Sequence, residues 1–300
     1  MNRGPVISEQ KIGPVSGVSA YVIWGLLPLY LLLVIEVPAL ELVSWRIVWT
    51  VPVCLLIVML RRQGREIAAA LRDKRALGWL VLSAGLIAAN WLIYIWAIQH
   101  EAVLAASLGY YINPLLNVVL GTVFLGESLS RRQWLAVAIA AIGVGILAWG
   151  AIGTLWISLG LAMSFGTYGI VRKQVSVGAL PGLTIESLLL FVPASAVVVY
   201  YAASPIGSSF DDSLLLGSAL AFGGVATAVP LLLFAIAARR MPYSTLGFIQ
   251  FLAPSIVFVL GLTVFEEPLL EEEVYSFVAI WLAAGIFVWD LLARRRVGRV

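Results

Sequence analysis

The chain has 300 residues, of which 62% are hydrophobic and 12% charged, and its mean hydropathy is +1.02. No single soluble core of this size can bury so much apolar surface, so the composition excludes a soluble domain and indicates an integral membrane protein. The single cysteine, Cys54, excludes a disulfide framework within one chain. The formal net charge of +3 is less informative than where the basic residues lie.

A helix needs about 20 mostly apolar residues to cross the hydrocarbon core of a bilayer. Ten such runs follow one another almost without a gap. They cover approximately residues 15–35, 37–60, 76–98, 102–125, 133–150, 152–171, 180–203, 213–237, 243–265 and 274–293. The first run is too long for a signal peptide, and no small-residue cleavage site follows it. The sequence therefore predicts an all-α polytopic membrane protein with ten transmembrane helices.

The basic residues predict the orientation of these helices. If the N-terminus lies in the cytoplasm, every Lys and Arg except Arg46 falls on the cytoplasmic side, and the opposite loops carry acidic residues instead. An excess of Lys and Arg in cytoplasmic loops is the rule for membrane proteins. We therefore expect both termini to be cytoplasmic.

The sequence also contains an internal repeat. Residues 113–129 match residues 253–269 at an offset of 140 without a gap, so that Pro114 corresponds to Pro254 and Glu127 to Glu267. Each half then contains five spans, and the odd number turns the second half over in the membrane.

This repeat predicts two domains. The first five-helix repeat covers residues 15–150, and the inverted second repeat covers residues 152–293. Inverted-topology repeats are typical of secondary transporters, in which two mirror-related halves alternately open a central site. The predicted architecture thus favours transport by alternating access.

Polar residues within the fourth run share one helical face. Ser107, Tyr110, Asn113, Asn117 and Gly121 are spaced by three or four residues. One interpretation is a polar stripe that lines a cavity. The other is interhelical hydrogen bonding, in which each bond contributes about 0.6–2 kcal/mol. We favour the cavity, because Pro114 also interrupts the hydrogen-bond ladder of this helix.

Other polar and aromatic residues lie deep in the predicted spans, where such groups are functional candidates by default. The predicted substrate pathway consists of Trp24, Asn90, Tyr94, Ser107, Tyr110, Asn113, Asn117, Tyr168 and Gln250. Four prolines are candidate helix breaks or gates, namely Pro28, Pro114, Pro230 and Pro254. Aromatic rings with neutral amides suit a small, partly apolar or zwitterionic organic solute better than an inorganic ion.

Three ionisable residues within the spans are candidates for an ion pair or for ion coupling, namely Glu41, Arg46 and Glu186. Arg46 pairs with Glu41, or extends to the membrane surface, or meets a substrate carboxylate; we favour pairing. Glu186 lies near one end of the seventh run, in a position that mirrors Glu41.

Several function classes are excluded or disfavoured. No lysine follows the glycine pattern of a phosphate-binding loop, which excludes an ATP-driven pump of that type. The single histidine, His100, is expected in a loop, so an intramembrane protease or metal centre is disfavoured. We expect no enzyme activity, cofactor, metal or nucleic-acid partner, and the oligomeric state is either monomer or homodimer. A non-transporting membrane scaffold or receptor remains an alternative.

The motifs resemble those of a known family. "AYVIWGLLPLY", "ELVSWRIVWT", "NWLIYIWAI", "SLGYYINPLLNVVLG", "RRQWLAVAIAAIGV" and "STLGFIQFLAPS" are similar to RarD-type permeases of the drug/metabolite transporter superfamily. The resemblance covers about residues 15–292. It implies two EamA-type inverted repeats, a pathway lined by helices 1, 3, 4, 6, 8 and 9, and a bacterial inner-membrane location. Ala105 departs from the glutamate that some relatives carry before "SLGY".

The resemblance also implies a function. Members are often labelled chloramphenicol-resistance permeases, and other relatives in the superfamily export amino acids and further metabolites. We therefore expect a secondary permease or exporter of small organic metabolites or drugs. Chloramphenicol-type drugs are one candidate substrate class, and amino acids or related metabolites are the alternative.

Overall fold

The computed structural model describes residues 9–100, 102–149, 152–205, 207–266 and 271–297. Within these ranges the ordered elements are α-helices and short 3-10 helices, without a strand. The elements are α1 (Glu9–Leu31), η1 (Leu32–Val34), α2 (Ala39–Arg61), α3 (Gly64–Arg72), α4 (Lys74–Gln99), α5 (Val103–Leu125), α6 (Arg131–Trp149), η2 (Ile152–Thr154), α7 (Leu155–Gln174), α8 (Ala179–Ala203), η3 (Ser209–Asp211), α9 (Leu214–Arg240), α10 (Tyr243–Gln250), α11 (Leu252–Thr263) and α12 (Glu271–Val297).

Ten segments of the described chain are long and apolar enough to cross a membrane. Each coincides with one of the ten predicted runs, from Lys11–Val34 at the start to Glu271–Arg294 at the end. Three of these spans consist of two elements each: α1 continues into η1, η2 precedes α7, and α10 is followed by α11. The prediction of ten spans is confirmed. A helix of this length suits a bilayer, because it keeps the backbone polar groups hydrogen-bonded within the hydrocarbon core.

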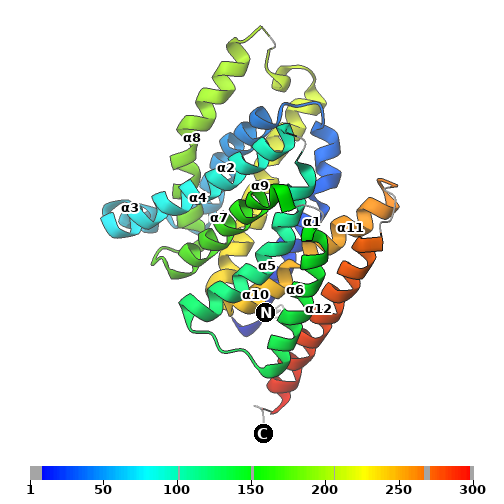
Figure 1. The fold of residues 1–300 in the computed structure, drawn as a ribbon. Helices are drawn as coiled ribbons and strands as arrows, with labels where there is room; N and C mark the ends of the chain where they lie inside the picture. Colours follow the sequence, from blue (N-terminus) through cyan, green and yellow to red (C-terminus); the bar gives the residue numbers. More distant parts are fainter. Residues whose placement is uncertain (1–8, 101, 150–151, 206, 267–270, 298–300) are drawn as a thin grey trace, which may run out of the picture. The chain divides into compact units, whose positions relative to one another are not determined.

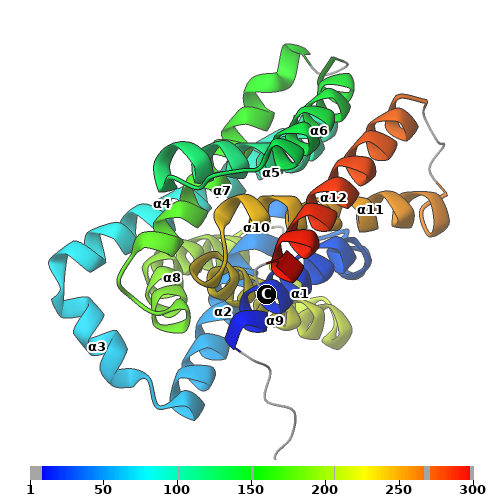
Figure 2. The ribbon, with the colours of Figure 1, turned by 90° about the horizontal axis from the view of Figure 1, so that it is seen from below.

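The helix α3 was not predicted from the sequence, which indicated only a basic loop after the second span. It links α2 to α4 and is drawn in cyan in Figures 1 and 2. Ala70 of α3 belongs to a buried cluster that also contains Leu80 of α4, Ile185 of α8 and Val177 in the connection before α8. The apolar side of α3 is thereby covered, and its arginines lie on the exposed side.

Only one of the four candidate helix-breaking prolines coincides with an interruption. Pro254 follows the break between α10 and α11, and the residue four positions before it is Gln250, the last residue of α10. A proline ring clashes with the carbonyl four residues earlier, which accounts for the break at this place. Pro28, Pro114 and Pro230 lie instead inside the continuous helices α1, α5 and α9. Each still lacks an N–H donor, but the helix continues through it.

The described residues pack into two compact units. Unit 1 consists of residues Met1–Ile95 and Tyr168–Arg240, and unit 2 consists of Trp96–Thr167 and Met241–Val300. Each unit contains spans from both halves of the sequence repeat.

Repeat-related spans pack on each other within these units. In unit 1 α2 packs on α8, the second and seventh spans. In unit 2 α5 packs on α10, and α6 on α12, which are the fourth and ninth and the fifth and tenth spans. A pseudo-two-fold axis between two inverted halves brings a span beside its own copy in this way.

Glycines allow the closest helix contacts in unit 1. Gly224 of α9 lies directly against the backbone of Trp49 on α2, and a Cβ atom there would collide with it. At the preceding residue of α9, a Cβ on Gly223 would meet the Tyr30 hydroxyl at 2.6 Å. Close backbone approach increases the dispersion contacts that hold membrane helices together, since lipid provides no hydrophobic driving force between them.

Small residues play the same part in unit 2. The face of α6 toward α12 contains buried Ala136, Ala140 and Gly143, and a Cβ on Gly143 would lie 2.9 Å from the Ser276 carbonyl oxygen. The two helices run side by side in Figures 1 and 2, with α6 in green and α12 in red. On the neighbouring pair, a Cβ on Gly247 of α10 would lie 2.7 Å from a backbone oxygen of α5.

Candidate functional site

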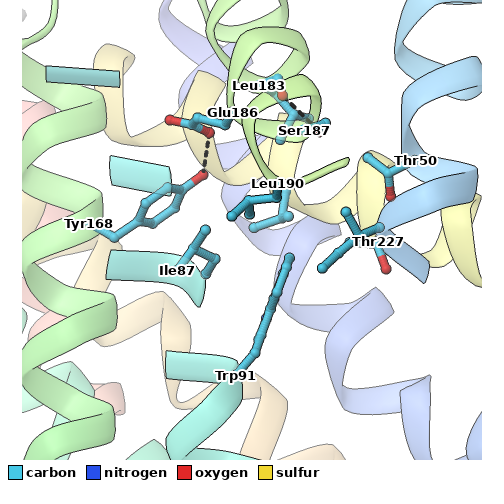
Figure 3. Close-up of a pocket in the computed structure, with 11 residues that line it drawn as sticks. Thr50, Ile87, Trp91, Tyr168, Leu183, Glu186, Ser187, Leu190 and Thr227 are labelled. Atoms are coloured by element: carbon cyan, nitrogen blue, oxygen red, sulfur yellow. Dashed lines mark hydrogen bonds between the residues drawn. The ribbon is translucent and has the colours of Figure 1, made fainter. Parts of the chain in front are cut away.

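Unit 1 contains a cavity bounded by α2, α4, α7, α8 and α9. Its polar lining residues are Thr50, Tyr168, Glu186, Ser187 and Thr227. Figure 3 shows Tyr168 pointing toward Glu186, with Thr50 and Thr227 on the opposite side and Trp91 below. The part of the cavity in which a water molecule fits measures about 20 Å³, enough for about one ordered water. In this conformation the cavity is therefore closed to an organic solute.

The carboxylate of Glu186 is the anionic group of this cavity. Glu186 is 2% exposed, and its side chain accepts hydrogen bonds from the Ser83 hydroxyl of α4 and, at 3.4 Å, from the Tyr168 phenol of α7. Arg172 Nη1 lies 3.3 Å from Glu186 Oε1. Three side chains from two helices, α4 and α7, thus supply partners to one buried carboxylate of α8, which meets the requirement that a charge at membrane depth be paired and hydrogen-bonded.

The partner of Glu186, Arg172, is fully buried. Its Nη2 atom donates a hydrogen bond to the Ala179 carbonyl oxygen at 2.8 Å. Gly182, four residues before Glu186 on the same face of α8, lies against the guanidinium, and any Cβ atom there would collide with it. From the sequence, Arg172 was counted only among the basic residues expected on the cytoplasmic side. Its burial and its pairing with Glu186 were not predicted, because they require the side chain to turn back into the protein.

The connection between α7 and α8 is held by two further basic side chains. Arg239 Nη1 donates to the carbonyl oxygens of Val175 at 2.6 Å and Val177 at 3.0 Å. Lys173 Nζ donates to the Ala238 carbonyl oxygen near the C-terminus of α9 at 2.9 Å. The last carbonyls of a helix have no intrahelical partner, and cations at this end also interact favourably with the helix dipole. These contacts hold in place the C-terminal end of α7, which carries Arg172.

Aromatic rings surround the other side of Tyr168. Phe234 of α9 stacks on Tyr168 with a centroid distance of 6.0 Å, and it also contacts Trp24 at 5.9 Å and Tyr21 at 6.4 Å. Two predicted pathway residues from the first and sixth spans, Trp24 and Tyr168, therefore meet through one phenylalanine. Phe234 is fully buried and was not predicted from the sequence as a site residue.

Arg46 and Glu41 each bind other groups in unit 1. Arg46 Nε donates to the Thr227 hydroxyl at 2.9 Å, so Arg46 adjoins the cavity lining. The carboxylate of Glu41 accepts from the Ser208 and Ser209 hydroxyls at 2.8 and 2.9 Å and from the Trp45 indole at 3.2 Å. These contacts satisfy Glu41 without an arginine.

Asn90 and Tyr94 lie one turn apart on α4. Asn90 is buried and Tyr94 is half-buried. The residues of α4 that line the cavity are their helical neighbours Ile87 and Trp91. The predicted residues thus lie on a helix that lines the cavity, but the lining residues Ile87 and Trp91 come three positions before Asn90 and Tyr94.

The polar stripe on α5 belongs to unit 2. Its members differ in environment: Asn113 and Asn117 are buried, whereas Tyr110 is 45% exposed and Ser107 half-buried. Asn117 Nδ2 donates to Gln250 Oε1 on α10 at 2.7 Å, which joins two predicted pathway residues in an interhelical bond. Among the described residues, the Oδ1 atoms of Asn113 and Asn117 accept no hydrogen bond. The stripe therefore contains a hydrogen bond that joins α5 to α10 and, among the described residues, two buried oxygen atoms that accept no hydrogen bond.

Glu127 caps a helix in unit 2. Its carboxylate accepts from the backbone N–H groups of Tyr243 at 2.6 Å and Ser244 at 2.9 Å, at the start of α10. Carboxylates stabilise helix N-termini, because they satisfy orphan N–H donors and interact with the positive end of the helix dipole. Glu267, the repeat counterpart of Glu127, lies outside the described residues.

The chain is similar in sequence to a known family of transporters. Residues 11–149 match the EamA-like transporter family. Over 289 residues the chain is 39% identical to Protein RarD of Salmonella typhimurium, which covers 96% of this chain and 98% of that protein. The chain belongs to the RarD-type permeases of the EamA superfamily. It is also 42% identical, over 93% of each chain, to an uncharacterized transporter of Pseudomonas aeruginosa.

Two further proteins are similar to this RarD-type chain at lower sequence identity. A Pseudomonas aeruginosa protein named chloramphenicol-sensitive protein RarD is 30% identical over 93% of this chain and 94% of that one. A protein of known crystal structure has a TM-score of 0.73 over 94% of this chain and 98% of its own, at 18% identity. The shared fold agrees with the predicted ten-helix architecture of two inverted five-helix repeats, and the protein is a multi-pass membrane transporter.

The residues that line the cavity of this RarD-type protein differ from those of the predicted substrate pathway. Of the predicted pathway and ion-coupling residues, only Tyr168 and Glu186 line it directly. Arg172, Ser83 and Phe234 complete the surroundings and were not predicted. The sequence contained one signal for the pairing of Glu186 with Arg172: a glutamate within a span needs a cation, and Arg172 lies 14 residues earlier in the chain, at the end of the preceding span.

Within the described residues, no group of three or more His, Cys, Asp or Glu side chains could hold a metal ion.

Proposed function

We propose that this protein is a secondary permease that moves a small organic metabolite or drug across the inner membrane by alternating access, without ATP. The observation that supports the proposal is the buried pair of Glu186 and Arg172 beside the hydroxyl-lined cavity of unit 1. Ionisable groups inside a membrane protein are costly and mark solute or ion pathways by default. A scaffold or receptor gives no reason for one member of such a pair, Glu186, to line a cavity.

The lining favours a particular class of solute. Arg172 neutralises Glu186, so the pair contributes no net charge. The hydroxyls of Thr50, Ser187 and Thr227 offer neutral hydrogen bonds, and the ring of Trp91 offers a flat apolar surface. These groups suit a neutral or zwitterionic molecule with an apolar part.

Two substrate classes meet this description. Amphenicols are neutral, with an aromatic ring and several hydrogen-bonding groups, and one relative is named a chloramphenicol-sensitive protein. Amino acids with apolar side chains are zwitterionic and are the alternative class. Because the cavity holds only about one water molecule here, the helices around it must separate before either solute enters.

Glu186 is the residue on which we expect transport to depend. When the solute enters, its polar groups compete with Ser83 and Tyr168 for the carboxylate oxygens. Exchange of these partners couples binding to a movement of α4 and α7 relative to α8. The stripe residues Tyr110 and Asn113 on α5 remain proposed parts of the pathway, and we expect alanine at either position to reduce transport.

The experiment is solute flux into proteoliposomes with a panel of chloramphenicol, leucine, phenylalanine and ethidium, preceded by a thermal-shift screen of the same compounds. A ligand that binds the folded state raises its melting temperature by mass action. The test variant is Glu186→Gln, which keeps the shape of the side chain. The matched control is Glu66→Gln on the exposed side of α3.

We expect flux of at least one neutral or zwitterionic solute, a loss of tenfold or more in Glu186→Gln, and no change in Glu66→Gln. Flux equal to that of protein-free liposomes for every solute would refute the permease and favour the scaffold or receptor. Normal flux in Glu186→Gln would refute the cavity as the site.

We also propose that both termini are cytoplasmic, because this orientation places the basic loop residues inside. A reporter enzyme that is active only in the cytoplasm, fused to the C-terminus, should be active. An inactive fusion that is stably expressed would reverse the orientation. Monomer and homodimer remain the two candidate oligomeric states.

A further inference from the structure

A second hollow lies in unit 2, where α6 begins and α12 approaches its end. It is lined by Ser130, Arg131, Arg132, Asp290, Ala293 and Arg294. The space in which a water molecule fits measures about 460 Å³, far more than in the cavity of unit 1. This hollow takes no part in the proposed transport site.

The two helices bring their basic ends together because they pack antiparallel. Gly143 of α6 lies against the backbone of Ser276 on α12. Toward the other end of the pair, the Ser130 hydroxyl donates to Asp290 Oδ2 at 2.8 Å. The corresponding membrane spans are Arg131–Trp149 and Glu271–Arg294, so the hollow lies at a surface of the bilayer.

The charges of the hollow leave an excess of cations. Asp290 Oδ2 lies 3.0 Å from Arg294 Nε, so the single carboxylate compensates one of three arginines. The guanidinium of Arg132 lies over the ring of Trp289, 4.6 Å from its centroid, which holds it at the rim. Arg131 and Arg132 are both exposed. Guanidinium groups are well matched to phosphate oxygens because they donate two parallel hydrogen bonds.

Apolar side chains continue from the hollow along the outside of both helices. Trp134 and Leu135 of α6 are 49% and 54% exposed, and Trp289 and Leu292 of α12 are 56% and 52% exposed. Tryptophans are enriched where hydrocarbon meets the headgroups, and exposed leucines at a span face acyl chains. A phosphate at the arginines would thus have its own hydrocarbon chains against this apolar surface.

We propose that the hollow binds the headgroup phosphate of an anionic phospholipid of the phosphatidylglycerol class. Arg131 and Arg132 supply the charge, the α6–α12 pair supplies the cleft, and the apolar surface accommodates the acyl chains. Basic pockets between transmembrane helices at a membrane surface are suited to such headgroups. A free phosphate would use the arginines but not the apolar surface.

The test is native mass spectrometry of the purified protein in an uncharged detergent, titrated with dioleoyl phosphatidylglycerol and with dioleoyl phosphatidylcholine. The chains of the two lipids are identical, so the difference in their dissociation constants reports the headgroup. We expect the first phosphatidylglycerol to bind about 30-fold more tightly, which corresponds to about 2 kcal/mol from two uncompensated arginines. The double variant Arg131→Gln/Arg132→Gln should lose this preference.

The matched control is Arg61→Gln/Arg65→Gln, which removes two exposed arginines outside the hollow. It should keep the preference, and inorganic phosphate at the same concentration should not displace the lipid. Equal loss in the control would show general charge attraction, and displacement by phosphate would show a soluble-anion site; either result overturns the proposal. So does a preference that survives in the test variant.

A further variant keeps the proposal testable if the double arginine variant fails to fold, as judged by its melting temperature in phosphatidylcholine. Ala293→Trp fills the hollow without changing a charge. It should reduce the preference for phosphatidylglycerol at least tenfold, and an unchanged preference overturns the proposal.

Discussion

The buried pair of Arg172 and Glu186 allows a quantitative test by a double-mutant cycle. The variants are Arg172→Leu, Glu186→Leu and the double substitution. Both side chains are at most 3% exposed and their charged atoms lie 3.3 Å apart. Removal of one partner from such a pair leaves an uncompensated buried charge and costs about 3–5 kcal/mol. We expect each single variant to be destabilised by about this amount.

The double variant should be destabilised by much less than the sum of the singles, because it leaves no charge behind. The Ser83 and Tyr168 hydroxyls and the Ala179 carbonyl each lose one hydrogen bond, and interhelical bonds in membranes average about 0.6 kcal/mol. With about 6–10 kcal/mol for the sum of the singles and about 2 kcal/mol for the double variant, the coupling free energy should be about 4 kcal/mol or more, well above the value of a neutral interhelical hydrogen bond.

The assay is reversible unfolding of the purified protein in mixed micelles, with the free energy of unfolding measured for all four proteins. Distant, independent sites add to within about 0.5 kcal/mol. Additivity of the two singles to within that limit would refute the pair as a coupled unit, whatever the size of each single effect.

Two further predictions concern unit 2. Gly143→Val should destabilise the protein by about 1–3 kcal/mol, because its Cβ atom would lie 2.9 Å from the Ser276 carbonyl oxygen. The measurement is thermal unfolding. The control is Gly145→Val, whose Cβ atom would meet no atom of a neighbouring helix within 4 Å, and it should behave like the wild type. Equal melting temperatures of the two variants would contradict the close packing of α6 on α12. Glu127→Ala should cost about 0.5–2 kcal/mol, because two N–H groups at the start of α10 lose their acceptor. Unchanged hydrogen-exchange rates of those two amides would contradict this capping role.

The repeat illustrates how far sequence symmetry carries over to structure. Pro114 and Pro254 occupy equivalent positions in the repeat, yet α5 continues through the first and the second follows a break after Gln250. The two prolines cannot be distinguished from the sequence, because a proline removes the same donor and adds the same clash in both places. Whether the helix absorbs that cost or ends depends on the neighbouring helices, which can satisfy the freed backbone groups.

The membrane itself explains why the number and positions of the ten spans could be predicted from the sequence. Hydrocarbon demands about 20 apolar residues in a helix for each crossing, and this requirement is local. The inverted repeat could likewise be predicted, since it needs only a match within the chain and an odd number of spans in each half. Family membership followed from the same local motifs.

The partners of the polar side chains were decided only by the tertiary structure. Asn117 is bonded to Gln250, 133 residues away, and Glu186 to Ser83, 103 residues away. Helical periodicity places a residue on a face, but it does not say which helix that face meets. The pairing of Arg172 with Glu186 depends on the turn between α7 and α8 and on the space beside Gly182, so it arises only when these helices pack.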